Sequence, residues 1–353
     1  MSAPPDRRGI GQAILAATLF GVSAPAAKAL LAEASPQLLA GLLYAGSGIG
    51  LAMVSVVRSR GQRSREAKLT SRDMPWLAGA IVFGGILGPV LLLFGLTQTP
   101  ASSASLLLNL EGVFTALIAW IVFRENVDRR IAMGMLAIVI GGVVLSWEGR
   151  ALWGGFMGAL AIAGACACWA IDNNLTQRVS AGDPVQIAMW KGLVAGAVNT
   201  GAALALGSTL PSEARILGAL ALGFASYGLS LVFFVLALRH LGTARTGAYF
   251  SLAPFVGAAI SLLIWREQPT ALFWVGVACM ATGVWLHISE RHQHAHVHDE
   301  MEHTHAHRHD EHHQHEHDPD DPPGEPHAHP HRHPRMAHSH PHYPDIHHRH
   351  RHD

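Results

Sequence analysis

Histidines at alternate positions are the feature of this chain most able to do chemistry. Of its 25 histidines, 23 lie between His292 and the last residue, Asp353. Alternate side chains of an extended chain lie on the same side, so each His-x-His pair can present two imidazoles to one ion. Neutral imidazole suits nickel, cobalt, zinc and copper. The candidate metal ligands are His292, His294, His296, His298, His303, His305, His307, His309, His312, His313, His315 and His317.

Acidic residues inside apolar stretches are the second candidate for chemistry. Glu111 and Asn109 lie in one such stretch, and Asp172, Asn173 and Asn174 lie in another. An acid at mid-bilayer depth costs about 2.5 to 3.5 kcal/mol on insertion scales, so it rarely faces lipid. Carboxylate and amide oxygens suit divalent ions, and two acids would balance a doubly charged cargo. We therefore expect these residues on a transport path, with a buried structural role as the alternative.

Lys191 is the basic candidate, because it follows Trp190 inside a further apolar stretch. It would either pair with Asp172 across the bundle or extend its ammonium group to the membrane surface. The three cysteines, Cys166, Cys168 and Cys279, also lie in apolar stretches. Their spacing gives neither a disulfide framework nor a CxxC zinc site.

The elements that must position these residues are membrane helices. Half of the residues are hydrophobic and 14% are charged, whereas soluble domains have roughly 25% charged residues. A span needs about 20 apolar residues, and lipid offers the backbone no hydrogen-bond partner, so each span must be helical. The sequence predicts ten spans, at about 9–31, 37–57, 74–97, 101–123, 131–147, 153–176, 185–206, 214–238, 244–265 and 270–288.

Lysine and arginine predict the orientation. With the N-terminal residues 1–8 inside, fourteen basic residues fall on the cytoplasmic side, six of them between Arg58 and Arg72. The opposite side receives Arg150, Arg215 and Arg266. Because ten spans are an even number, this asymmetry places both termini in the cytoplasm. We expect the chain in a bacterial inner membrane. The tail, residues 289–353, is polar and rich in proline, so we expect it to be disordered and cytosolic.

An internal repeat appears when the sequence is shifted by 142 residues. LEGVFTALIAWIVFRE, 110–125, then lies over LAPFVGAAISLLIWRE, 252–267, while Gly134 falls on Gly276 and Gly141 on Gly283. Since five spans are an odd number, the second copy would enter the membrane from the opposite side. We expect two inverted repeats, 9–148 and 153–288, with a site near the midplane between them.

These segments also carry a resemblance. The body, with GLTQTPASSASLLLNLEGVFTALIAWIVFRE and its weaker copy LALRHLGTARTGAYFSLAPFVGAAISLLIWRE, resembles the EamA family of the drug/metabolite transporter superfamily over nearly all of 9–288. The resemblance implies a ten-span exporter of small solutes that works by alternating access. Many members have a proline after the acid of the fourth span, where this chain has Gly112. With its tail, the chain is also similar to bacterial nickel and cobalt resistance permeases.

Two functions follow from these patterns. The first is a proton-coupled exporter of nickel or cobalt, or else of zinc, in which the tail captures ions. The second is a metabolite or drug exporter whose tail stores or senses metal. Both expect a lipid bilayer around the body, a small cationic substrate, no tightly bound cofactor and no nucleic-acid partner. Neither is an enzyme, and a homodimer stays open.

Overall fold

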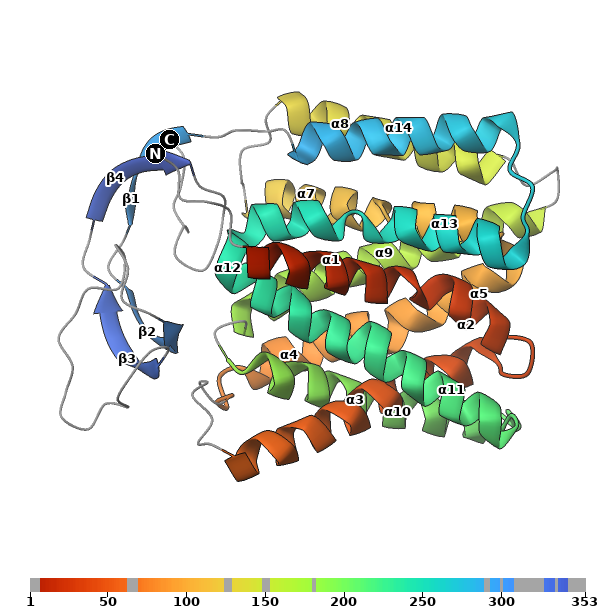
Figure 1. Cartoon of the computed structure of the whole chain (residues 1–353), viewed down its shortest axis with the longest axis horizontal. Coiled ribbons are helices and arrows are strands. Elements are labelled where there is room, and N and C mark those ends of the chain that lie inside the picture. Colours follow the sequence, from red (N-terminus) through yellow and green to blue (C-terminus); the bar gives the residue numbers. More distant parts are fainter. Residues whose placement is uncertain are drawn as a thin grey trace.

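The computed structural model describes residues 7–61, 69–123, 129–147, 153–179 and 182–288 of the body, together with four segments of the tail, 293–298, 301–307, 327–333 and 336–341. The described body elements are helices, laid side by side in a bundle (Figure 1).

The first half of the body runs from α1 to α8. Its elements are α1 (Arg7–Gly21), α2 (Ser23–Leu30), α3 (Pro36–Gly61), α4 (Met74–Ala80), the π-helix η1 (Ile81–Leu87), α5 (Gly88–Gln98), α6 (Ala101–Leu107), α7 (Leu110–Phe123) and α8 (Arg129–Trp147). The boundary between α5 and α6 follows from Pro100. The residue before a proline is driven out of the helical region, and Thr99 is extended, with φ −126° and ψ 142°.

The second half repeats this order. Its elements are α9 (Trp153–Val179), α10 (Pro184–Ala205), α11 (Glu213–Gly223), the π-helix η2 (Phe224–Leu229), α12 (Ser230–Phe250), α13 (Ala253–Trp265) and α14 (Ala271–Ile288). A shift of 142 residues places η1 over 223–229, so the two π-helical segments occupy equivalent positions.

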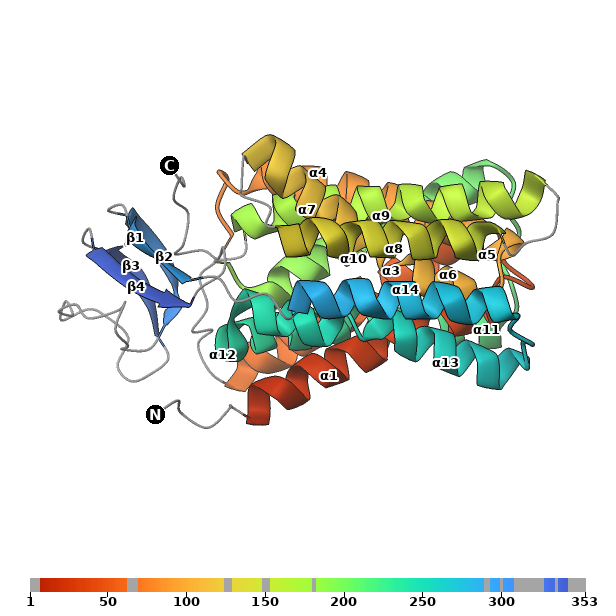
Figure 2. The ribbon, with the colours of Figure 1, turned by 90° about the horizontal axis from the view of Figure 1, so that it is seen from above.

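Two pairs of equivalent helices, α3 with α10 and α8 with α14, pack against each other antiparallel, as seen for α8 and α14 in Figures 1 and 2. A Cβ added to Gly141 would lie 3.0 Å from the carbonyl oxygen of Gly276, and one added to Gly283 would lie 2.6 Å from that of Gly134. The 142-residue shift takes Gly141 to Gly283 and Gly134 to Gly276, so the two contacts are equivalent in the repeat. Glycine is required at both because a side chain would keep the helices apart.

Helix α12 runs across the boundary that the sequence predicts between spans 214–238 and 244–265. The structure continues the helix through that boundary, from Ser230 to Phe250. Yet the rings of Phe234 and Phe250 are 4.8 Å apart, whereas sixteen residues of straight helix would extend about 24 Å. The chain therefore reverses direction within α12. Pro100 breaks the first copy at the equivalent place, where the second copy has Gly242.

The surface of the bundle suits lipid. Seven helical stretches in the described part of the chain are long and apolar enough to cross a membrane, and α13 and α14 are shorter apolar helices. Large apolar side chains are exposed on the outside, including Trp147, Leu263 and Val57. The prediction of an all-α, multi-pass membrane protein is confirmed, while the number of ten spans stays a prediction.

The described segments of the tail are strands. Four strands form two antiparallel pairs: β1 (Gln293–His298) with β4 (Met336–Pro341), and β2 (Met301–His307) with β3 (His327–His333). The alternation of histidine with other residues has the two-residue period of a strand, which fits this pairing. The disorder expected for the tail as a whole stays a prediction.

Candidate functional site

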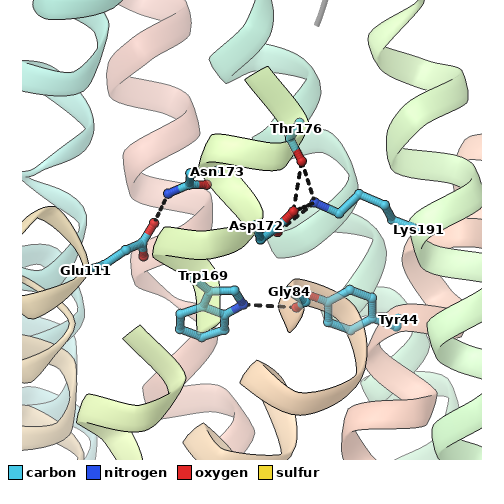
Figure 3. A network of polar contacts seen from close by, with 8 residues as sticks. All are labelled: Tyr44, Gly84, Glu111, Trp169, Asp172, Asn173, Thr176 and Lys191. Carbon is cyan, nitrogen blue, oxygen red and sulfur yellow. Dashed lines mark hydrogen bonds and ion pairs between the residues drawn. The ribbon is translucent and has the colours of Figure 1, made fainter. Parts of the chain in front are cut away.

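A buried ion pair joins α9 to α10 (Figure 3). The Nζ of Lys191 donates to both carboxylate oxygens of Asp172, each at 2.7 Å. Thr176, one turn further along α9, donates from its hydroxyl to Oδ1 of Asp172 at 2.8 Å. Both charged side chains are 9% exposed. Of the two alternatives for Lys191, the structure therefore adopts pairing across the bundle and not extension to the membrane surface.

The backbone of η1 lies directly against this ion pair. A Cβ added to Gly84 would lie 2.7 Å from the Cβ of Asp172 and closer still to its carboxylate. Glycine at position 84 therefore permits the close approach of η1 to α9. The carboxylate lies between a backbone that carries no side chain and the ammonium group of Lys191.

Side chains from three helices hold the carbonyl groups of η1. The Tyr44 hydroxyl of α3 and the Trp169 indole Nε1 of α9 donate to the Gly84 carbonyl at 2.7 and 3.0 Å (Figure 3). The Asn199 amide of α10 donates to the Gly85 carbonyl at 3.1 Å. A π-helical turn disturbs the regular backbone ladder and is frequent at functional sites. Here it places backbone oxygens where α3, α9 and α10 meet.

Glu111 makes a separate contact on another side of α9. The break between α6 and α7 puts Glu111 in the first turn of α7, where the helix dipole favours a negative charge. The Nδ2 of Asn173 donates to Oε1 of Glu111 at 2.7 Å. In the described part of the chain the Glu111 carboxylate, which is half-buried, has no ion-pair partner.

The predicted site residues therefore do not all meet. Because successive residues of a helix differ by about 100°, Asp172 and Asn173 face different neighbours. Figure 3 shows Glu111 with Asn173 on one side of α9 and Lys191 with Asp172 on the other. Asn174 donates to the Ala170 carbonyl of its own helix at 2.8 Å. Asn109 donates to the Leu106 carbonyl at 2.9 Å, so its amide serves the break between α6 and α7.

This separation bears on metal binding. In the part of the chain whose side chains are described, no group of three or more His, Cys, Asp or Glu residues could hold a metal ion. Of the predicted tail ligands, His294, His296 and His298 lie on β1, and His303, His305 and His307 lie on β2. The remaining ones, His292, His309, His312, His313, His315 and His317, lie outside the described residues.

Sequence reasoning missed Tyr44, Trp169 and Thr176 as members of the network. Thr176 had a usable signal, because it lies four residues after Asp172 and so on the same face of a helix. Tyr44 and Trp169 had no such signal in the sequence. Both donate to the backbone carbonyl of Gly84 in η1, and only the tertiary packing brings them to it. Gly84 stands out in sequence only as a small residue for close packing.

A second polar cluster closes the end of the bundle where α2 and α11 meet. Glu33 accepts from Nε of Arg215 at 3.1 Å and from the Ser212 hydroxyl at 3.0 Å. The hydrogen bond from Ser212, with Arg215 nearby, lowers the pKa of Glu33. In a separate contact, Glu267 accepts from the backbone N–H and the hydroxyl of Ser102 in α6. These contacts join the first half of the chain to the second.

The turn at Arg266 brings the Glu267 side chain to the start of α6. Arg266 ends α13 in the left-handed region, with φ 47°, a conformation that is uncommon for residues other than glycine and that frequently ends a helix. The carboxylate of Glu267 also accepts from the Ala101 N–H at 2.9 Å. It therefore caps the free N–H groups at the start of α6.

Comparison with known proteins gives a consistent result. The EamA-like transporter family matches residues 7–147 and 156–289. An uncharacterized transporter of Methanothermobacter thermautotrophicus is 29% identical over 294 residues, 77% of this chain and 84% of the relative. A probable amino-acid metabolite efflux pump of Escherichia coli is 27% identical over 202 residues, 54% of this chain and 68% of the relative.

A solved structure shows the same fold. One crystal structure superimposes with a TM-score of 0.59 and covers 79% of this chain and 94% of its own. The sequence identity is 17%, so this likeness concerns the fold alone.

Proposed function

Because the chain belongs to the EamA-like transporter family, we propose that it exports a small solute carrying a cationic group, in exchange for protons at Glu111. The coarser function follows from the family: the chain is a multi-pass membrane transporter of the efflux type and not an enzyme. The proposal adds the charge of the solute, the coupling ion and the acid that handles both.

The distribution of charge carries this proposal. Asp172 and Lys191 compensate each other inside the bundle, whereas Glu111, on another side of α9, has no ion-pair partner in the described part of the chain. Together the three groups have a formal charge of −1. One carboxylate can bind one ammonium group or one proton, so the two would compete for Glu111. Such competition couples the export of a cation to the entry of a proton.

Asn173 supports this role. Its amide donates a hydrogen bond to Glu111 and leaves the carboxylate without compensating charge. The printed name of the Escherichia coli relative, an amino-acid metabolite efflux pump, fits a solute that carries an amine. The antiparallel packing of equivalent helices fits a path between inverted halves.

Metal export is the second candidate, favoured by the histidines of the tail. In this proposal the tail faces the cytosol of a bacterial cell, captures nickel, cobalt or zinc, and raises the ion concentration at the inner mouth. The separation of Glu111 from Asp172 weighs against it, because a divalent ion would meet one uncompensated carboxylate and no third ligand. An organic cation needs no such set of ligands.

Transport into inside-out vesicles separates the two candidates. We would impose a pH gradient and compare a panel of amines and amino-acid derivatives with Ni²⁺, Co²⁺ and Zn²⁺. The same panel is applied to a chain ending at Glu290. We expect gradient-driven uptake of an organic cation by both chains. Uptake of metal alone, lost with the tail, would overturn the proposal in favour of metal export.

A further inference from the structure

The four tail strands form two ladders with one common register. The first ladder pairs Gln293 with Pro341 and the second ends at the pair of His307 with His327. In both ladders the two residue numbers of each pair add to the same total, so the numbering of the second ladder continues that of the first. The pairs therefore have the register of a single long hairpin.

This register sets histidine opposite histidine. Five pairs consist of two histidines each: His294 with His340, His296 with His338, His303 with His331, His305 with His329, and His307 with His327. The two remaining histidines of the ladders are opposite methionine, in the pairs His298 with Met336 and Met301 with His333. Each of the twelve histidines in the four strands is thus paired with a metal-binding residue type.

The sequence supports this register independently of the ladders. The alternation of histidine changes phase between β1 and β2, from even to odd positions, and it changes back between β3 and β4. A slip of one residue would leave no histidine opposite histidine or methionine, and it would move most of them opposite alanine, threonine, proline or another residue that is a poor ligand. The same register also sets Glu302 opposite Arg332, a cross-strand pairing of opposite charges that stabilises a hairpin.

We propose that the paired strands form a binding ribbon for late first-row transition-metal ions. Residues directly opposite each other in an antiparallel pair share a face, with Cβ atoms about 4.5–5.5 Å apart. Positions i and i+2 of one strand share that face too. Two neighbouring pairs therefore offer four ligand positions at the corners of a small rectangle, the number that a tetrahedral ion such as Zn²⁺ takes.

The residue types define the class of ion. Imidazole suits zinc, copper, nickel and cobalt, and the thioether of methionine adds a soft ligand at the two mixed pairs. Seven pairs contain histidine, so two pairs per ion give a capacity of about three ions. A two-stranded ribbon is marginally stable by itself in water, and metal binding would supply folding free energy. The inference concerns binding alone and holds whichever solute the body transports.

A pair of double variants tests the register. We would use the full-length protein in detergent, with Co²⁺ as the probe, and measure bound cobalt by equilibrium dialysis. The first variant, His305→Ala with His329→Ala, removes one opposed pair. The matched control, His305→Ala with His338→Ala, removes the same number of histidines, but one from each ladder. Size-exclusion profiles verify that every variant remains folded.

The ribbon predicts different losses for these two variants. The first should lose about one ion per chain, no more than His305→Ala alone, because both residues serve the same ion. The control should lose about two ions, the sum of its single variants. Equal losses from both doubles would overturn the proposal, since they would mean that the histidines bind as independent ligands. The cobalt absorption spectrum should show four-coordinate geometry, and a purely octahedral spectrum would also contradict it.

Discussion

Replacing Lys191 by methionine would test the buried ion pair. The change keeps the length of the side chain and leaves the Asp172 carboxylate, which is 9% exposed, without its ammonium partner. Breaking a buried pair at one side costs about 3–5 kcal/mol. Thr176 retains its hydrogen bond to Asp172, so we expect a loss of about 3 kcal/mol.

The assay is thermal unfolding of the purified protein in detergent. At about 2 °C per kcal/mol, the melting temperature of Lys191→Met should fall by about 6 °C. Adding Asp172→Asn should restore most of the loss, because no buried charge then lacks a partner. Lys28→Met is the matched control, since Lys28 donates to a backbone carbonyl, that of Thr99, and should lose less. A melting temperature unchanged by Lys191→Met would refute the assignment of this pair as a support of α9 and α10.

Three further predictions follow from other contacts. Gly84→Ala should strongly reduce the yield of folded protein, because its Cβ would overlap the Asp172 carboxylate. The control Gly112→Ala, with no atom near its added Cβ, should be neutral or stabilising by up to about 1 kcal/mol. Equal yields of the two variants in size-exclusion chromatography would contradict the packing of η1. Arg215→Ala should weaken the contact with Glu33 and so increase thiol labelling of a cysteine introduced by Ser35→Cys. Labelling equal to that of the Ser35→Cys parent would show that this cluster does not close the α2–α11 end. A chain ending at Glu290 should insert and fold normally but bind less metal, and failure to insert would mean that the body needs the tail.

Patterns with a fixed period could be predicted from the sequence, whereas tertiary contacts could not. Apolar length gave most of the spans, and the 142-residue repeat gave the glycine contacts of α8 with α14. Within α12 the helix continues across residues 239–243, where the sequence predicts a boundary, because the second copy has Gly242 in the place of Pro100. The pairing of Lys191 with Asp172 stayed open because it depends on how α9 and α10 meet across residues 180–183.

The π-helical segment shows a different limit. Its carbonyl groups accept hydrogen bonds from Tyr44, Trp169 and Asn199, which lie on three other helices. A local sequence such as that of η1 carries no sign of these donors. In the tail, the alternation of histidine predicts candidate ligands, but their pairing across the long segment 308–326 depends on the register of the strands.

The central claim is that Glu111 exchanges a cationic solute for a proton. The most direct measurement is solute-driven proton movement in inside-out vesicles, followed with a pH-sensitive dye, for the wild type, Glu111→Gln and Glu213→Gln. Glu213 is exposed at the start of α11, so its variant removes the same charge away from the site. The wild type and Glu213→Gln should release protons when the solute enters, and Glu111→Gln should release none while being equally abundant. Undiminished proton exchange by Glu111→Gln would contradict the account.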